Sequence, residues 1–231
     1  MYSRGITLGR GAHGIVYASV SPDGCEVAVK EYPNYADGIF ALRSIDAIAG
    51  PLCALADEHV TVPILSVMSA PPQLVMPVCT RPPDSWWPEV ISLANALLSR
   101  GCAMSDIKPA NLGVLDGRLV LLDVEAISET TGPFTGMGSY PVIIWDRWIS
   151  AGGTDDISAR LRSDRRANIA LTRYSALATA AAMAKAPCPL SAHSIDFLDN
   201  PAATMMWAEL QNDMDASPLF QEARARSACT L

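Results

Sequence analysis

The chain has 231 residues, half of them hydrophobic and 18% charged, with a formal net charge of −7 and a pI near 4.9. This composition predicts a packed core rather than disorder, and the acidic balance argues against general nucleic-acid binding. The six cysteines have no C-x-x-C spacing, so we expect free thiols in an intracellular, reducing compartment. No apolar run reaches 18 residues and no signal-peptide pattern opens the sequence, so we expect no membrane association.

The first predicted element is a β-hairpin over residues 6–20 with a glycine-rich turn. Gly9, Gly11, Gly14 and Val16 form the pattern G-x-G-x-x-G-x-V. Glycines let the backbone approach phosphates closely and point amides at them. A dinucleotide-binding loop would need a helix directly after the last glycine, whereas a turn and another β-rich run follow here. The pattern therefore favours a phosphate-binding hairpin.

The hairpin is followed by a predicted strand and a predicted helix. Residues 25–31 read as a strand that contains Val-Ala-Val-Lys and delivers Lys30. Residues 36–57 carry apolar side chains at helical spacing, and we expect Gly50 and Pro51 to break or kink that helix.

Two further strands are predicted over residues 60–67 and 73–79. The Pro-rich stretch 80–85 then suggests a boundary between two lobes. A helix should follow up to Gly101, with Ser85 as its N-cap.

The most informative stretch sets Asp106, Lys108 and Asn111 close together in sequence. An Asp-Gly pair, a strong signal for a two-residue hairpin turn, separates it from the apolar run 119–124, which delivers Asp123. Two carboxylates, an amide oxygen and an ammonium suit a site for magnesium and phosphate. Beyond it we expect an Ala-rich helix up to Lys185 and two helices near 202–213 and 217–227.

Taken in order, these motifs resemble the eukaryotic-type protein kinases, and Asp-Ile-Lys-Pro-Ala-Asn is similar to the serine/threonine-specific catalytic loop. The resemblance implies an α+β, bilobal, protein-kinase-like fold. A small antiparallel β N-lobe with one helix would span about 1–79, and a mostly helical, shortened C-lobe would span about 80–231. Trimmed kinases of this kind occur in large DNA viruses, which suggests a viral source.

The resemblance also implies an activity, the transfer of the γ-phosphate of ATP, with Mg²⁺, to serine or threonine hydroxyls of a protein substrate. Asp106 would accept or orient the substrate proton, and Lys108 would neutralise the transferring phosphoryl group. Lys30 would contact the α- and β-phosphates, while Asn111 and Asp123 would hold magnesium.

The same resemblance implies a nucleotide-binding surface, with Met76 guarding the back of the adenine pocket and Cys79 in the hinge. Its members are Leu8, Gly9, Gly11, Gly14, Val16, Ala28, Lys30, Met76 and Cys79.

Several positions depart from the family pattern. The helix that should supply a glutamate to pair with Lys30 has none before Glu58, so Asp46 is the best available acid and Asp37 the second choice. The usual Asp-Phe-Gly is Asp-Val-Glu, at residues 123–125, which keeps the metal ligand and loses the glycine.

Other departures concern regulation and the second lobe. The His-Arg that usually precedes the catalytic aspartate is Met-Ser here, so we expect activity without loop phosphorylation. A short activation segment should cover 126–141, with 136–140 at its end. Asp164 is expected to hydrogen-bond the catalytic-loop backbone, and Asp155 and Asp156 are alternatives.

Two other functions stay open at this point. A pseudokinase, acting as a nucleotide-binding or scaffolding module, would explain the altered motifs and the small C-lobe. A small-molecule kinase of the aminoglycoside type is less consistent with the glycine-loop pattern and with Asp-Ile-Lys-Pro. The sequence does not indicate an oligomeric state.

Overall fold

The computed structural model describes residues 2–11, 13–131, 164–187, 198–218 and 221–222. The chain divides into two compact units. The first contains Met1–Pro82 and Gly113–Glu125, and the second contains Pro83–Leu112 and Ala126–Leu231. The first unit thus extends to Pro82, slightly beyond the predicted N-lobe boundary at residue 79, and it also includes Asp123, which lies within the predicted C-lobe.

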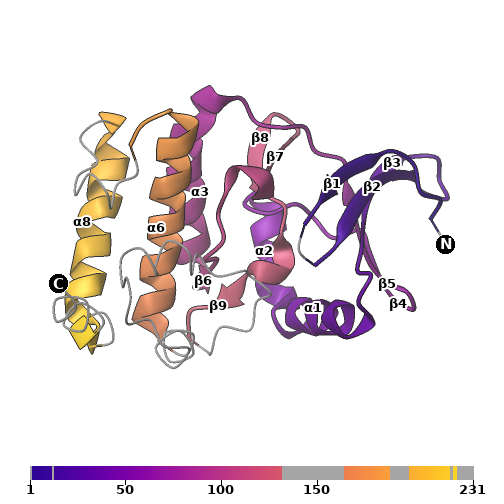
Figure 1. Ribbon diagram of the computed structural model, residues 1–231, viewed down its shortest axis with the longest axis horizontal. Coiled ribbons are helices and arrows are strands. Elements are labelled where there is room, and N and C mark those ends of the chain that lie inside the picture. The colour runs from indigo at the N-terminus through magenta and orange to yellow at the C-terminus, as the bar shows by residue number, and fades with distance from the viewer. Residues whose placement is uncertain (1, 12, 132–163, 188–197, 219–220, 223–231) are drawn as a thin grey trace, which may run out of the picture. The chain divides into compact units, whose positions relative to one another are not determined.

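A five-stranded antiparallel sheet forms the centre of the first unit (Figure 1). Its strands, in spatial order, are β1 (Thr7–Arg10), β2 (Ile15–Val20), β3 (Glu26–Glu31), β5 (Pro72–Pro77) and β4 (Ser66–Ser69). The predicted glycine-rich hairpin is confirmed, since β1 and β2 pair directly across it.

The register of this sheet places four of the predicted nucleotide-binding residues on one face. Val16 lies opposite Lys30, and Ala28 lies opposite Met76. Directly paired residues, and residues two apart on one strand, point to the same side of a sheet, so these four side chains share a face. The opposite face carries a buried cluster of Tyr17, Val27, Val29 and Val75.

Two helices follow β3 where the sequence suggests one broken or kinked helix. Helix α1 covers Tyr35–Ala47 and begins at Asn34, whose side chain accepts a hydrogen bond of 2.9 Å from the Ala36 amide. Helix α2 covers Ala49–Asp57. Pro51 lies in the first turn of α2, where its missing N–H costs nothing, but its ring would collide with the carbonyl four residues earlier in a continuous helix. The break therefore falls at Ile48 rather than at Gly50.

The strand expected over residues 60–67 is wrong in position, because β4 begins only at Ser66. Residues before it turn instead toward the other segment of the first unit. The Val62 amide donates a hydrogen bond of 2.9 Å to the Leu121 carbonyl, and Thr61 forms an isolated parallel bridge with Leu121.

The hairpin before Asp123 is confirmed. Strands β7 (Leu112–Leu115) and β8 (Arg118–Leu121) pair with each other around Asp116 and Gly117. Both turn residues have positive φ, 49° and 74°, as the tight turns of two-residue hairpins require. Asp123 follows two residues after β8 and lies just before the short 3₁₀ helix η3 (Val124–Ala126).

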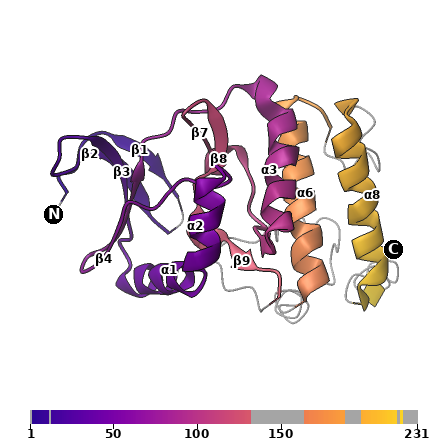
Figure 2. The ribbon, with the colours of Figure 1, turned by 180° about the vertical axis from the view of Figure 1, so that it is seen from behind.

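Three helices dominate the second unit, with α6 (Arg165–Met183) packed against both α3 (Trp87–Ser99) and α8 (Pro201–Ala216) (Figures 1 and 2). The buried face of α8 comprises Ala203, Met206, Leu210 and Met214, at helical spacing. Short strands β6 (Cys102–Ala103) and β9 (Ser128–Glu129) pair beside them.

The predicted N-cap of α3 is wrong. Ser85 lies instead inside the 3₁₀ helix η1 (Asp84–Trp86), and α3 begins after Trp86 with a proline in its first turn and no side-chain cap. The predicted Ala-rich helix and the first of the two C-terminal helices are confirmed as α6 and α8.

Some predictions fall outside the described residues. These are the end of the activation segment at 136–140, the alternatives Asp155 and Asp156, and most of the helix expected at 217–227. Within the described part of the chain, no single helix is long and apolar enough to cross a membrane. Helices α1 and α2 meet that criterion by length and composition only as a pair bent by 73°.

Candidate active site

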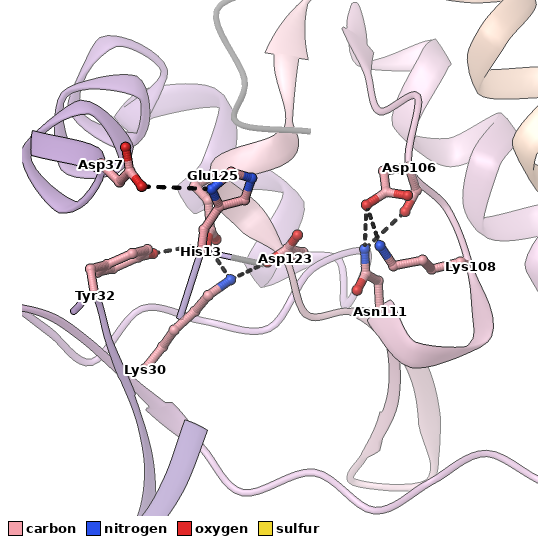
Figure 3. Close-up of polar contacts among 9 residues, drawn as sticks. All are labelled: His13, Lys30, Tyr32, Asp37, Asp106, Lys108, Asn111, Asp123 and Glu125. Atoms are coloured by element: carbon pink, nitrogen blue, oxygen red, sulfur yellow. Dashed lines mark hydrogen bonds and ion pairs between the residues drawn. The ribbon is translucent and has the colours of Figure 1, made fainter. Parts of the chain in front are cut away.

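In the first unit, the candidate site residues form an ammonium group held between two carboxylates. Lys30, on β3, forms ion pairs with Asp123 and with Glu125, both of which follow β8 (Figure 3). The lysine and Asp123 are 93 positions apart in the sequence, and the fold of the first unit brings them together. The sequence predicts the meeting of Lys30 and Asp123 but not the participation of Glu125.

The three charged side chains of this group, Lys30, Asp123 and Glu125, are largely buried. The exposed fractions of the side chains are 13% for Lys30, 20% for Asp123 and 1% for Glu125. Burial by itself would lower the pKa of Lys30, but the carboxylates of Glu125 and Asp123 outweigh it and raise that pKa above its ordinary value. Lys30 therefore stays protonated at neutral pH and presents a permanent positive charge.

Glu125 is held by a second contact. The Tyr32 hydroxyl donates a hydrogen bond of 2.8 Å to Oε1 of Glu125, the same oxygen that meets Lys30. Burial raises the pKa of the Glu125 carboxyl and the Lys30 ammonium opposes that rise. Burial is the main cause that raises the pKa of Tyr32, and the nearby Glu125 charge adds to it, so the Tyr32 hydroxyl remains a donor.

The predicted pairing of Lys30 with an acid of the following helix is wrong. Asp46 is exposed on α1, and its carboxylate forms no ion pair with Lys30. The second choice, Asp37, lies in the first turn of α1, where its Oδ2 is 3.9 Å from Nδ1 of His13 in the glycine-rich turn. The acid that meets Lys30 comes instead from a distant part of the sequence.

In the second unit, the candidate site residues lie on the loop that carries Asp106. Lys108 Nζ lies 2.6 Å from Oδ2 of Asp106, and Asn111 Nδ2 donates hydrogen bonds to the Asp106 carbonyl at 2.9 Å and to Oδ2 at 3.2 Å (Figure 3). The three residues predicted from the Asp-x-Lys-x-x-Asn pattern therefore form one hydrogen-bonded group within the second unit. Asp106 is largely buried, with 12% of its side chain exposed, and Lys108 is 44% exposed.

Hydroxyl groups of α6 hold this loop. The Met104 amide donates to Thr172 Oγ1 at 3.0 Å, and Thr179 Oγ1 donates to the Ile107 carbonyl at 2.7 Å. Ser175 Oγ lies 3.4 Å from the Met104 carbonyl. These contacts anchor the backbone on both sides of Asp106.

The predicted role of Asp164 in holding the loop is wrong. Asp164 is the N-cap of α6, where its Oδ1 accepts hydrogen bonds from the Arg166 and Ala167 amides at 2.8 and 3.1 Å. A short acid directly before a helix is best placed to satisfy the unpaired amides of the first turn. Its sequence position before the Ala-rich run was already a signal for a cap.

Of the predicted nucleotide-binding residues, Gly14 and Val16 lie directly beside Lys30. A Cβ atom added to Gly14 would lie 2.9 Å from the Glu31 carbonyl and 3.4 Å from the Lys30 side chain, so the glycine turn lies directly against the lysine. Ala28 and Met76 are buried, whereas Leu8 is 44% exposed. Gly9, in β1, and Gly11, in the turn, have no neighbouring atom within 4 Å of an added Cβ, so the space beside them is open.

Cys79, the predicted hinge residue, is half-buried with a free thiol. Burial, with a smaller contribution from the Asp116 carboxylate, raises the pKa of that thiol to about 11. Its backbone neighbour Thr80 pairs with Val114 through two hydrogen bonds, of 3.1 and 2.8 Å, which fixes the segment that follows β5.

Each unit offers an oxygen atom of the kind that magnesium prefers, although no group of three or more His, Cys, Asp or Glu gathers among the described residues. Magnesium is usually bound through one or two carboxylates plus oxygens of the substrate phosphates, so such a group is not required. Lys30 engages Oδ1 of Asp123, which leaves Oδ2 as the coordinating atom. Asn111 engages Asp106 through its nitrogen, so its oxygen is the atom available for a cation.

Sequence reasoning missed Glu125, Tyr32 and the hydroxyls of α6. The hydroxyls carried a signal, since Thr172, Ser175 and Thr179 stand at positions i, i+3 and i+7 and therefore share one face of the helix. Glu125 and Tyr32 carried no pattern of their own.

The antiparallel sheet with its lysine strand and the helical unit with its Asp-Lys-Asn loop define a protein-kinase-like fold. Solved structures with this fold match nearly the whole chain. A point-mutant form of the PknI kinase domain of Mycobacterium tuberculosis aligns with a TM-score of 0.56 and 19% identity, over 98% of this chain and 95% of its own. A rhoptry kinase of Toxoplasma gondii aligns with a TM-score of 0.58 and 10% identity, over 99% of this chain and 80% of its own.

At these identities the likeness shows the fold. No protein-family model matches the sequence, and no curated protein matches it either.

Proposed function

We propose that this protein is a serine/threonine protein kinase that transfers the γ-phosphate of ATP to hydroxyl groups of a protein substrate. The observation that carries the proposal is the ion pair between Lys30 and Asp123, because it joins the predicted phosphate-binding cation to the predicted metal ligand. A packed domain gains little stability from a buried ion pair, so a functional reason for this one is favoured.

The chain's own groups divide the work of phosphoryl transfer. Lys30 holds the α- and β-phosphates of ATP, while the glycine turn presents backbone amides to them. Asp106 orients the attacking hydroxyl and accepts its proton, and Lys108 neutralises charge on the transferring group. Magnesium, held by Asn111 and Asp123, would supply further charge neutralisation at the phosphates. Both sets of residues must act on one nucleotide for this chemistry to proceed.

Specificity for serine and threonine is inferred from Lys108, two residues after the aspartate, as in the serine/threonine-specific loops that this sequence resembles. The free thiols of Cys25, Cys53, Cys79 and Cys102 support our further proposal of a reducing, intracellular setting.

The test is transfer of labelled phosphate from ATP to casein and to a library of serine, threonine and tyrosine peptides. Asp106→Asn and Lys30→Met should each reduce the rate by about 100-fold or more, because each removes a group that acts directly on the reacting phosphate. The matched controls Asp46→Asn and Lys185→Met change exposed residues of the same types and should retain the wild-type rate.

Equal background labelling by the wild type and both variants would overturn the kinase proposal. Nucleotide binding without transfer would then favour the pseudokinase scaffold. Labelling confined to tyrosine peptides would overturn the proposed specificity alone.

A further inference from the structure

The position of Lys30 depends on an acid that no motif predicts. In protein kinases the strand lysine must pair with a glutamate of the following helix before the site is competent. Here α1 offers Asp46, which is exposed, and Asp37, which faces His13. The requirement for a carboxylate beside Lys30 is therefore met by a residue outside the helix.

Glu125 meets that requirement in three respects. Its carboxylate pairs with Lys30, its side chain is only 1% exposed, and the Tyr32 hydroxyl fixes it through a hydrogen bond of 2.8 Å. Tyr32 lies two residues after Lys30, so the lysine and the group that fixes its partner belong to one stretch of chain. Figure 3 shows Lys30, Tyr32 and Glu125 converging in this way.

The burial of Glu125 is costly unless Lys30 stays in place. Its Oε2 is buried and has no hydrogen-bond partner among the described residues, so the carboxylate is compensated mainly through Oε1. Removing one partner of a buried pair leaves an uncompensated charge, which is strongly unfavourable. Glu125 therefore restrains the ammonium more tightly than an exposed helix acid would.

The two carboxylates beside Lys30 also differ in what else they can do. Asp123 is 20% exposed and is the proposed metal ligand, whereas Glu125 is sealed from solvent and bound to Tyr32. If Asp123 turns to a metal ion, Glu125 remains to hold the lysine.

We propose that Glu125 is the positioning residue for Lys30, held by Tyr32, and that the acid of α1 is not needed to complete the site. This inference rests on the proposed function, since it assigns how the phosphate-binding lysine of that site is held. One consequence is that displacement of α1 does not by itself switch off the lysine.

The experiment measures binding of ADP, with magnesium, and of adenosine to the full chain by calorimetry. Glu125→Gln should weaken ADP binding by about tenfold, because a charged hydrogen-bond partner of Lys30 is lost. Adenosine lacks the phosphates that Lys30 contacts, so its affinity should not change. Tyr32→Phe should weaken ADP binding by about threefold while preserving the packing of the ring.

Measuring Glu125→Gln in a protein that also carries Lys30→Met shows whether Glu125 acts by positioning Lys30 or only by stabilising the fold. If Glu125 acts through Lys30, Glu125→Gln should cause no further loss of ADP affinity in a protein that already carries Lys30→Met. Asp46→Asn is the matched control and should bind ADP like the wild type.

The results test the role of Glu125 separately from the proposed kinase function. Wild-type ADP affinity in Glu125→Gln, with weakened binding in Lys30→Met, would overturn the inference and leave the proposed function standing. The inference would also be overturned if Glu125→Gln weakened ADP binding further in the Lys30→Met protein, or if it weakened adenosine binding equally. The same holds if Asp46→Asn weakened ADP binding as much as Glu125→Gln does. If Glu125→Gln does not fold, Tyr32→Phe provides the same comparisons. Absence of any phosphate-dependent binding by the wild type would overturn the proposed function itself.

Discussion

The hydroxyl of Thr179 donates a hydrogen bond of 2.7 Å to the backbone carbonyl of Ile107, the residue directly after Asp106. Both partners are buried, with 4% and 3% exposed. A buried carbonyl without a donor carries a desolvation penalty, so this contact decides where the backbone beside Asp106 can lie. Helix α6 thus acts as a template for the loop that carries Asp106, the proposed catalytic base.

Replacing Thr179 with valine tests this template, because the side chain keeps its shape and loses only the donor. We expect the free energy of unfolding to fall by about 1–3 kcal/mol, since the Ile107 carbonyl is left unpaired. Small displacements of a catalytic group are costly, so kcat should fall by about tenfold while the KM for ATP changes little. Urea unfolding and steady-state kinetics measure the two effects.

Thr204→Val is the matched control, because Thr204 is exposed on α8 and its hydroxyl donates to the carbonyl of Asn200, the N-cap of the same helix. It should leave kcat unchanged. Wild-type kcat in Thr179→Val would show that the loop is positioned without this hydroxyl.

The parts of the site that can be predicted from the sequence are those that depend on residues close together in the chain. The glycine turn, the Val-Ala-Val-Lys strand and the Asp-Gly hairpin each depend on residues close together in the chain, and all three are confirmed as structural elements. The meeting of Lys30 with Asp123 followed once both strands were placed. The helical spacing of the hydroxyl residues on α6 is also visible in the sequence, but it indicates a contact only when the loop beside that helix is known.

The partner of Lys30 could not be predicted in the same way. The prediction of Asp46 depends on the acid coming from the next helix, and helical periodicity does not show how the exposed side of that helix lies relative to a strand. Glu125 is selected by burial and by Tyr32, both of which are properties of the folded chain. A glutamate two residues after Asp123 looks only like a lost glycine until the fold is known.

A second prediction concerns the pH dependence of stability through Glu31, at the end of β3. Partial burial raises the pKa of Glu31, but hydrogen bonds from Arg4, Gln73 and Tyr17 more than offset it and place that pKa below its ordinary value of 4.5. A carboxylate with a lowered pKa stabilises the fold above pH 4.5, and this contribution is lost as the pH falls through the folded-state pKa. Glu31→Gln should therefore lower stability at pH 7, and the difference from wild type should shrink at more acidic pH.

Urea unfolding of both proteins between pH 7 and pH 3 gives this difference directly. Glu26→Gln, at the exposed start of the same strand, should show a much smaller effect at pH 7. A stability difference for Glu31→Gln that is the same at every pH would mean that its charge is not the stabilising property.

The third prediction concerns the glycine-rich hairpin, where Gly14 is crowded and Gly9 and Gly11 are not. Replacing each glycine therefore distinguishes effects on stability from effects on ATP binding. A Cβ at Gly9 or Gly11 meets no atom within 4 Å, whereas at Gly14 it would lie 2.9 Å from the Glu31 carbonyl. Gly9→Ala and Gly11→Ala should therefore keep wild-type stability, yet weaken ATP binding because the added carbon obstructs the approach of the phosphates to the backbone. Gly14→Ala should reduce both stability and ATP binding, since the crowded β2 terminus must shift.

Thermal unfolding and ATP titration of the same samples distinguish these outcomes, with Gly50→Ala as the control. Gly50 is exposed in α2 with no atom near an added Cβ, so its replacement should keep ATP affinity; the gain in helix propensity and the restriction before Pro51 oppose each other, so stability should change by about 1 kcal/mol or less. Unchanged ATP affinity in both Gly9→Ala and Gly11→Ala would contradict a phosphate-binding role for the turn. That role requires backbone amides to contact the phosphates, and a loss of affinity without a loss of stability is the combination that only such close contact explains.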